Sequence, residues 1–188
     1  MRKGFETGDA RAAEAPAGAG DRQLMSAADL AVLEEQLGRP SRGVVGIAAR
    51  CVCGRPIVVR TAPRLDDGTP FPTTFYLTCP GAVAAVSTLE ASGVMQEMSE
   101  RLVNDGALGA AYLRAHAHYL AERAKLGIVD EITGISAGGM PTRVKCLHVL
   151  VAHALAAGPG VNPLGDEAIA LIRDTWRPDV CSCRAVTS

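Results

Sequence analysis

The stretch GVVGIAARCVCGRPIVVRT, residues 43–61, contains two runs of β-branched residues joined by a short turn. Valine and isoleucine recur in residues 43–51 and 56–61, as is typical of strands, and residues 52–55 separate the two runs. The stretch therefore predicts two paired strands with cysteines at their connection. After a loop rich in proline and glycine, TTFYLT at residues 73–78 predicts a third strand.

The pattern on both sides of these strands is helical. Ser26 and Asp29 form a capping signal for a short helix that Gly38 ends, and Pro80 suits the first position of a helix that continues to about Asn104. Further helices are predicted at about residues 107–126, 142–157 and 166–172. Strands followed by helices predict an α+β fold, in which a small antiparallel or mixed sheet from the N-terminal half packs against four or five helices.

Length and composition favour one domain. A chain of 188 residues with 48% hydrophobic side chains can bury one sizeable core. We expect a disordered tail at residues 1–24, a single α+β domain at residues 25–175 and a C-terminal tail at residues 176–188. Cys181 and Cys183 in that last tail are expected to be exposed or loosely ordered, although they could complete a site from the C-terminus.

Charge and hydropathy exclude two classes of partner. A net charge of -1 argues against nucleic-acid binding by bulk electrostatics. We expect no signal peptide, because no apolar core follows Arg2 and Lys3, and the sequence has no stretch near the roughly 20 apolar residues needed to cross a bilayer. We therefore expect a cytoplasmic protein without membrane contact. Thiols are kept reduced there, so the six cysteines are expected to be ligands, reactive thiols or small core residues rather than disulfides.

Three cysteines lie at predicted strand ends. Cys51 and Cys53 form a C-x-C at the hairpin turn before Gly54, a setting that zinc ribbons and knuckles use. Cys79 ends a strand and precedes Pro80, where a helix dipole favours a thiolate. The alternative is that these cysteines are small buried core residues, because free cysteine is among the most buried residue types.

The segment KCLHVLVAH adds Cys146, His148 and His153. In a regular helix Cys146 and His148 point in different directions, and Cys146 and His153 lie roughly 10 Å apart along the axis. A ligand pair therefore requires that the helix begin near Cys146 or be distorted there. With the cysteines of the strand ends, these residues predict a Cys/His metal site with Cys51, Cys79, Cys146, His148 and His153 as ligands. Zinc suits such a site better than an iron–sulfur cluster.

Two further groups of residues could take part in the chemistry of this site. Arg143 and Lys145 follow a glycine loop at the start of a predicted helix, which predicts binding of an anion such as phosphate. Cys53, Glu90 and His116 are expected to support the metal or to act as acid or base. A helical stripe such as that of His116 is more often a satisfied, half-buried surface. A buried Glu90 would need a cation opposite, for which the candidates are Arg123, Arg143 and Lys145.

Residues 134–138 match G-x-S-x-G, the nucleophile elbow of serine hydrolases. The approach to Ser136 contains Asp130, Glu131 and Thr133 and is a poor buried strand. We predict that Ser136 is not a nucleophile and that its side chain contacts the backbone of a glycine-rich loop.

Three stretches carry a resemblance: RCVCGRPIVVRTAPRLDDGTPFPTTFYLTCP, LEASGVM and SAGGMPTRVKCLHVLVAHALAAGPGVNPLGDE. They resemble a family of uncharacterised bacterial proteins that is common in high-G+C Gram-positive bacteria, has a domain-of-unknown-function label and is often encoded near exopolyphosphatase and a septum-formation protein. The resemblance extends over residues 43–167. It implies a site built from Cys51, Cys79, Cys146 and a histidine, with the position of Cys53 and the Ser136 loop more variable, and it implies no activity.

The function predicted from the sequence is a cytosolic metal-binding protein, with zinc as the expected metal. The alternative is a metal-dependent or thiol-dependent enzyme that acts on a small anionic substrate, such as one that bears a phosphate. In the thiol-dependent case Cys79 would be the nucleophile with a histidine as base. A structural metal takes all four ligands from protein, whereas a catalytic metal leaves one position to water.

Overall fold

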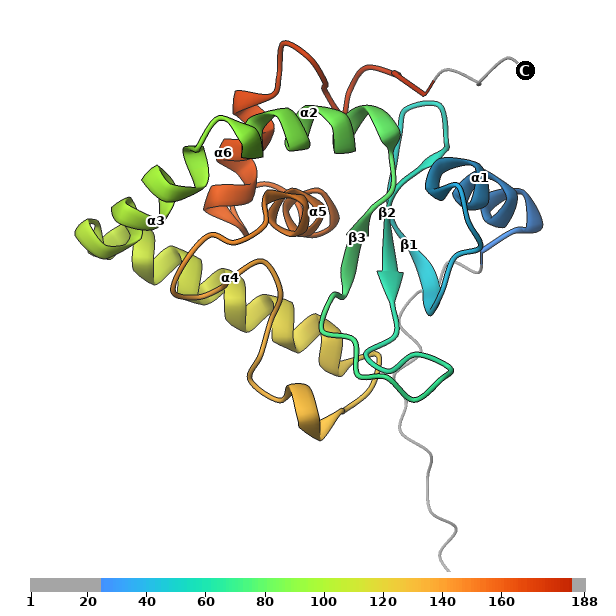
Figure 1. Cartoon of the computed structure of the whole chain (residues 1–188), viewed down its shortest axis with the longest axis horizontal. Helices are drawn as coiled ribbons and strands as arrows, with labels where there is room; N and C mark the ends of the chain where they lie inside the picture. Colours follow the sequence, from blue (N-terminus) through green and yellow to red (C-terminus); the bar gives the residue numbers. More distant parts are fainter. Residues whose placement is uncertain (1–24, 184–188) are drawn as a thin grey trace, which may run out of the picture.

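The computed structural model describes residues 25–183, so the tail predicted at residues 1–24 lies outside the described residues. The described part of the chain contains six α-helices, one 3-10 helix and a three-stranded antiparallel sheet (Figure 1). The α+β fold predicted from the sequence is confirmed. The sheet comes from the N-terminal half, as expected, and it is antiparallel throughout.

Residues 43–61 build two of the three strands. Strands β1 (Val44–Arg50), β2 (Pro56–Thr61) and β3 (Phe75–Leu77) lie in the order β1-β2-β3. The β1–β2 turn is tight, because the amide of Cys51 donates to the carbonyl of Arg55 at 2.8 Å and the amide of Gly54 donates to the carbonyl of Cys51 at 2.8 Å. Gly54 has φ 86, a left-handed conformation that glycine adopts without strain. This turn fixes the first C-x-C at one end of the sheet.

Helices cover both faces of the sheet. Helix α5 (Leu147–Ala157) lies against one face and contacts all three strands, while α1 (Ala27–Leu37) lies on the other side, next to β2 (Figure 1). The described part of the chain has five further helices. They are α2 (Pro80–Ala91), α3 (Val94–Asn104), α4 (Gly106–Ala124), the 3-10 helix η1 (Asp130–Ile132) and α6 (Pro163–Leu171).

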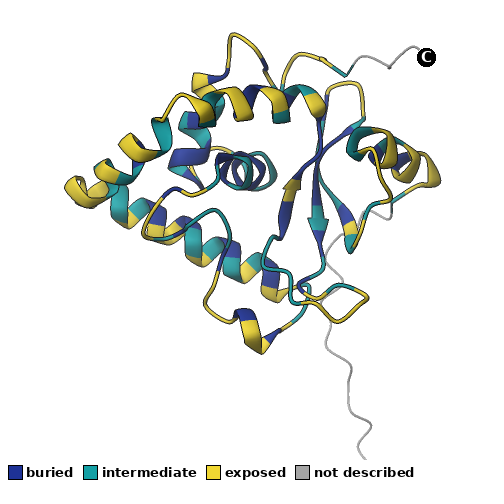
Figure 2. Cartoon of the chain, in the orientation of Figure 1, coloured by how far each residue is buried: buried dark blue, intermediate teal, exposed yellow. Residues whose placement is uncertain are grey.

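Helix α5 is the centre of the core. Leu147, Leu150 and Val151 have no exposed surface, and Figure 2 shows α5 buried inside a shell whose outer faces are exposed. Helix α6 approaches it closely at Gly165, where an added Cβ would lie 2.3 Å from the carbonyl oxygen of Leu150. A glycine is therefore required at this contact.

Two helices differ most from the predicted bounds, and α6 begins at Pro163 rather than at residue 166. The helix expected from Pro80 to Asn104 is divided into α2 and α3, because Gly93 has φ 86 and cannot continue a right-handed helix in that conformation. The helix expected from residue 142 begins only at Leu147, since the amide of Lys145 donates to the carbonyl of Gly138 at 2.8 Å and closes a loop instead.

The segment after α6 returns to the sheet. Trp176 is 3% exposed and packs near Gly81 in the first turn of α2, where a Cβ on Gly81 would lie 3.3 Å from Trp176 and 2.9 Å from the hydroxyl of Ser182. Figure 1 shows this segment passing above α2 towards the β1–β2 turn. Trp176 is thus packed against the domain, whereas most of residues 177–183 are exposed on its surface. None of the helices among residues 25–183 has the length and apolar character needed to cross a membrane.

Candidate metal sites

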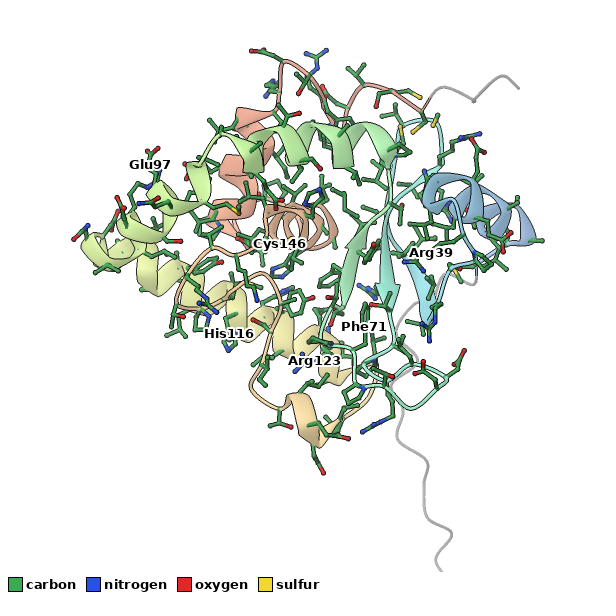
Figure 3. All side chains as sticks on the ribbon, viewed as in Figure 1. Arg39, Phe71, Glu97, His116, Arg123 and Cys146 are labelled. Carbon is green, nitrogen blue, oxygen red and sulfur yellow. The ribbon has the colours of Figure 1, made fainter. Side chains whose placement is uncertain are left out.

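Four cysteines from the two ends of the domain meet at the β1–β2 turn. The sulfur atoms of Cys51, Cys53, Cys181 and Cys183 all lie within 4.8 Å of one another. All six cysteines of the chain lie in its described part, and none forms a disulfide there. We call these four residues the four-cysteine cluster. Figure 3 shows sulfur atoms gathered where the C-terminal segment reaches the turn.

Each half of the four-cysteine cluster is held by structure that does not involve sulfur. The guanidinium of Arg50 donates to the carbonyl of Gly54 at 2.8 Å and binds Asp29 of α1 at 2.7 Å, which supports the turn from behind. Burial of Trp176 holds the other half, five residues before Cys181. The cluster is therefore built on two positioned loops.

The four thiols have different environments. Burial raises the pKa values of the Cys51 and Cys183 thiols, whereas a hydrogen bond from the backbone of Arg55 lowers the pKa of Cys53 to about 7. The side chain of Arg55 forms a 3.2 Å ion pair with Glu35, which raises the pKa of its guanidinium, and the charges of Cys183 and Cys53 add to this effect. A bound divalent cation would favour the thiolate form of all four cysteines, because coordinated thiols are deprotonated.

The geometry fits a single metal ion. A tetrahedral zinc with Zn–S bonds of about 2.3 Å separates its sulfur ligands by about 3.8 Å, and the sulfurs of the four-cysteine cluster lie within 4.8 Å of one another. All four coordination positions would then be filled by protein.

A second group lies between α2 and α5. Ligand atoms of Glu90, Cys146 and His148 lie within 4.8 Å of one another. Nδ1 of His148 is 3.1 Å from Oε1 of Glu90 and 4.0 Å from Sγ of Cys146. The hydrogen bond to Cys146 and the negative charge of Glu90 raise the pKa of His148 to about 9.

Cys146 and His148 meet because α5 begins between them. Cys146 is the N-cap residue of α5 with extended φ and ψ of -154 and 113, and His148 is in the first turn. This is the condition under which the sequence allows the two side chains to approach. Glu90 helps to fix this beginning of the helix, because its Oε1 accepts a hydrogen bond from the amide of Leu147 at 2.6 Å and so occupies the helix N-terminus. Figure 3 labels Cys146 beside α5.

The ligands predicted from the sequence are thus divided between two places. Cys51 is in the four-cysteine cluster, as is Cys53, which was expected only to support the metal. Cys146 and His148 are in the second group with Glu90, which was expected to face a cation such as Arg123. Cys79 and His153 belong to neither group in the described part of the chain.

Cys79 and His153 are both buried. Cys79 is the N-cap residue of α2 and is 1% exposed. Its charge helps to raise the pKa of the Cys183 thiol, after the larger effects of burial and of Cys51. Cys79 and Glu90 mark opposite ends of α2, which separates them by roughly 16 Å along the helix axis. His153 is fully buried and bonds to His118 and Asn162 at 2.9 and 3.2 Å.

Arg143 and Lys145 are exposed and line a surface hollow together with residues 135–140. Their backbone amides are not free for an anion, because they donate to the carbonyls of Gly139 and Gly138 at 3.1 and 2.8 Å. The amide of Leu147 is occupied by Glu90. Anion binding by the two side chains stays a prediction.

Ser136 and His116 form a separate pair. Oγ of Ser136 lies 2.9 Å from Nδ1 of His116 and donates to the carbonyl of Met140 at 3.2 Å. The 3-10 helix η1 precedes this loop, so no strand of the described chain leads into Ser136. Burial, followed by the charge of Arg123, lowers the pKa of His116. Its role as an acid or base stays a prediction, as does the absence of a nucleophilic role for Ser136.

Cys181 and Cys183 were expected mainly as exposed or loosely ordered residues of the tail, and were not among the predicted ligands. Cys181 and Cys183 repeat the C-x-C spacing of Cys51 and Cys53, and this repetition was the available signal. Two identical C-x-C pairs can supply the four thiolates of a closed site.

These features define a class: a small α+β domain with a cysteine cluster at one end of its sheet. The sequence matches the family described as Protein of unknown function (DUF501) over residues 47–170, more than half of the chain, and the chain belongs to this family. Glu90, Cys146 and His148 lie inside the matched range, while Cys181 and Cys183 lie beyond it. No curated protein and no solved structure matches the chain significantly.

Proposed function

We propose that the protein binds zinc through the four-cysteine cluster and that the metal fastens its C-terminal segment to the β1–β2 turn. The observation that carries the proposal is the convergence of four sulfur atoms, within 4.8 Å of one another, from two C-x-C pairs that lie far apart in the sequence. Four thiolates around one ion make a closed structural site. The zinc would thus stabilise a folded arrangement rather than activate water.

Three further features support zinc in this position. Cys53 and Cys181 are exposed, so the metal has a path to the site. The positive charge of Arg55 interacts with Cys183 and Cys53 and so opposes the negative charge that four thiolates and one dication leave. Zinc is preferred by tetrahedral thiolate sites, although iron accepts the same ligands. A colourless purified protein would favour zinc over an iron–sulfur centre.

The test uses the full chain purified under reducing conditions without chelator. Elemental analysis should find zinc, and a Cys181→Ser/Cys183→Ser variant should contain about one zinc fewer per chain, since two of the four ligands are removed. Cys79→Ala is the matched control, because it removes a nearby buried thiol that is outside the cluster. Equal zinc in the parent and the double variant would refute the proposal.

Trp176 gives a second readout that does not depend on counting metal. It is the single tryptophan of the chain, and it is 3% exposed just before the four-cysteine cluster. Removal of zinc by a strong chelator should loosen the C-terminal segment and shift tryptophan fluorescence to longer wavelength. The double variant should show the shifted spectrum before any chelator is added, and Cys79→Ala should respond as the parent does.

A further inference from the structure

The second group, Glu90 with Cys146 and His148, presents three electron-pair donors to one point. Glu90 is in the last turn of α2, and the other two residues are at the beginning of α5. The side chains of Glu90 and His148 are 23% and 26% exposed, so the point they share is reachable from solvent. This group is independent of the four-cysteine cluster, because no residue is common to both.

The orientation of His148 is fixed by its other nitrogen. Nε2 lies 3.3 Å from the carbonyl oxygen of Val83 and 3.2 Å from Oγ of Ser87. A carbonyl oxygen only accepts hydrogen bonds, so Nε2 carries a hydrogen. In the neutral imidazole, Nδ1 then carries the lone pair, and this lone pair faces the Glu90 carboxylate at 3.1 Å.

The three donor atoms that face one point are stabilised by a cation between them, either a proton on Nδ1 or a metal ion. A proton on Nδ1 would satisfy Glu90 but leaves Sγ of Cys146 4.0 Å away, a long contact. A metal ion would bind all three atoms. Tetrahedral zinc with bonds of about 2.3 Å to sulfur and about 2.0 Å to nitrogen and oxygen separates its ligand atoms by roughly 3.3 to 3.6 Å. The distances of 3.1 and 4.0 Å lie on either side of that range.

The surroundings are those of a metal ligand set. Ligating histidines usually donate their second ring N–H to a backbone carbonyl or a carboxylate, as His148 does to Val83. The carboxylate of Glu90 is itself held, because it accepts the amide of Leu147 at 2.6 Å. Both ligands are thus oriented before a metal binds.

We infer that Glu90, Cys146 and His148 form a second zinc site with three protein ligands and one position open to water. Three protein ligands with an open fourth position distinguish catalytic zinc sites from structural ones. The site would polarise a bound water or a substrate oxygen. It lies wholly within the family segment of residues 47–170, in contrast to the four-cysteine cluster.

The experiment isolates this site in the full chain by using the Cys181→Ser/Cys183→Ser variant, which lacks two ligands of the four-cysteine cluster. The reduced, metal-free variant is titrated with Co²⁺ alone. We expect one Co²⁺ to bind per chain, with a thiolate-to-cobalt charge-transfer band in the near ultraviolet that disappears when Cys146→Ser is added. Glu90→Gln should weaken Co²⁺ binding about tenfold or more, while an oxygen remains to accept the Leu147 amide.

Thr88→Ala is the matched control on α2, because the Thr88 hydroxyl is exposed and bonds only within its own helix, to the carbonyl of Ala84 at 3.0 Å. The Cys181→Ser/Cys183→Ser variant is the background to which each substitution is added. Thr88→Ala should leave the Co²⁺ binding of this background unchanged. Circular dichroism of each metal-free variant establishes that it is folded. The inference is overturned if the background binds no Co²⁺ or if Cys146→Ser leaves the band unchanged.

A proton in place of the metal has its own signature. A background that binds no Co²⁺, and in which iodoacetamide alkylates Cys146 rapidly below pH 8, contains an imidazolium–thiolate pair, and that result also overturns the inference. Failure of the four-cysteine proposal is recognised separately, because it is measured by the difference in metal content between the parent and this background.

Discussion

The side-chain amide of Asn162 donates a hydrogen bond to Nδ1 of His153 across 3.2 Å, and both side chains are fully buried. The direction is fixed because Oδ1 of Asn162 already accepts the amide of Gly165 at 3.0 Å as the N-cap of α6. Nε2 of His153 therefore carries the hydrogen and donates to Nδ1 of His118 at 2.9 Å. One directed chain of hydrogen bonds thus joins α6, α5 and α4.

This arrangement predicts an acid-sensitive core. Burial, followed by the charge of His118, lowers the pKa of His153 to about 4, while Glu122 opposes this shift. The unfolded chain has a histidine pKa of about 6.5 and so binds more protons than the folded chain between these values. The contribution of His153 to the stability is therefore complete above about pH 6.5 and is lost as the pH falls towards 4, by about 3 kcal/mol at most.

The measurement compares urea unfolding of the parent and His153→Gln at several pH values. The difference in their free energies of unfolding should shrink from pH 7 to pH 4.5, and the metal sites largely cancel in the comparison. A difference that is constant over this interval would contradict the prediction. NMR titration of the His153 ring measures its pKa directly.

Gly165 is predicted to be intolerant of substitution. Gly165→Ala would place Cβ 2.3 Å from the carbonyl of Leu150 and 2.8 Å from Cβ of Ala154, so α5 and α6 must separate. We expect a loss of about 2–3 kcal/mol or more, as in overpacked cores. Gly106→Ala is the control, because an added Cβ there meets nothing within 4 Å, and it should be neutral or stabilising. Thermal unfolding of both variants tests the contrast.

The elements of the fold were predictable because each has a local cause. The β-branched runs before and after residues 52–55 became β1 and β2, and Pro80 begins α2 as expected. The beginning of α5 was not predictable, since it depends on Glu90, which is 57 residues before the Leu147 amide it accepts. Helical periodicity contains no information about such a partner.

The candidate sites were predictable by residue type more than by grouping. Cysteine and histidine indicate metal chemistry wherever they occur, but the sequence does not say which of them meet. Cys181 reaches the β1–β2 turn because Trp176 is buried and because Gly81 leaves room for Ser182, and both are tertiary contacts. The expectation of one Cys/His site therefore combined residues that the structure divides between two ends of α2.

The ion pair between Asp29 and Arg50 is predicted to stabilise the attachment of α1 to the sheet. Asp29 receives two bonds from Arg50, at 2.7 and 3.0 Å, and one from the amide of Ser26 in a capping box. Asp29→Asn should lower the free energy of unfolding by about 1–3 kcal/mol, because a partly buried Arg50 loses its charged partner.

The control for Asp29 is Asp67→Asn. Asp67 also pairs with an arginine, Arg42, but the two side chains are 49% and 58% exposed. Solvent screens such a pair, so we expect a change within about 1 kcal/mol. Urea unfolding of the two variants measures both values, and equal losses would show that burial is not what gives the Arg50 pair its strength.

Arg123 is predicted to hold the loop that contains Ser136. This residue of α4 is 6% exposed, and its guanidinium donates to the carbonyls of Ile132 at 2.7 Å, Ile135 and Pro72. Figure 3 labels it on α4, beside the segment that follows this helix. Arg123→Met keeps much of the apolar volume but removes every donor, so the carbonyls it serves lose this partner. We expect a loss of about 1–3 kcal/mol in the free energy of unfolding, as well as faster amide exchange in residues 132–136.

Two further variants separate the possible causes of this loss. Arg114→Ala on the exposed face of the same helix is the control and should change stability by less than about 0.5 kcal/mol. Arg123→Lys distinguishes charge from geometry: an ammonium cannot span several carbonyls as the guanidinium does, so this variant should recover only part of the loss. Full recovery by lysine would mean that the positive charge alone, rather than the set of donors, holds the loop.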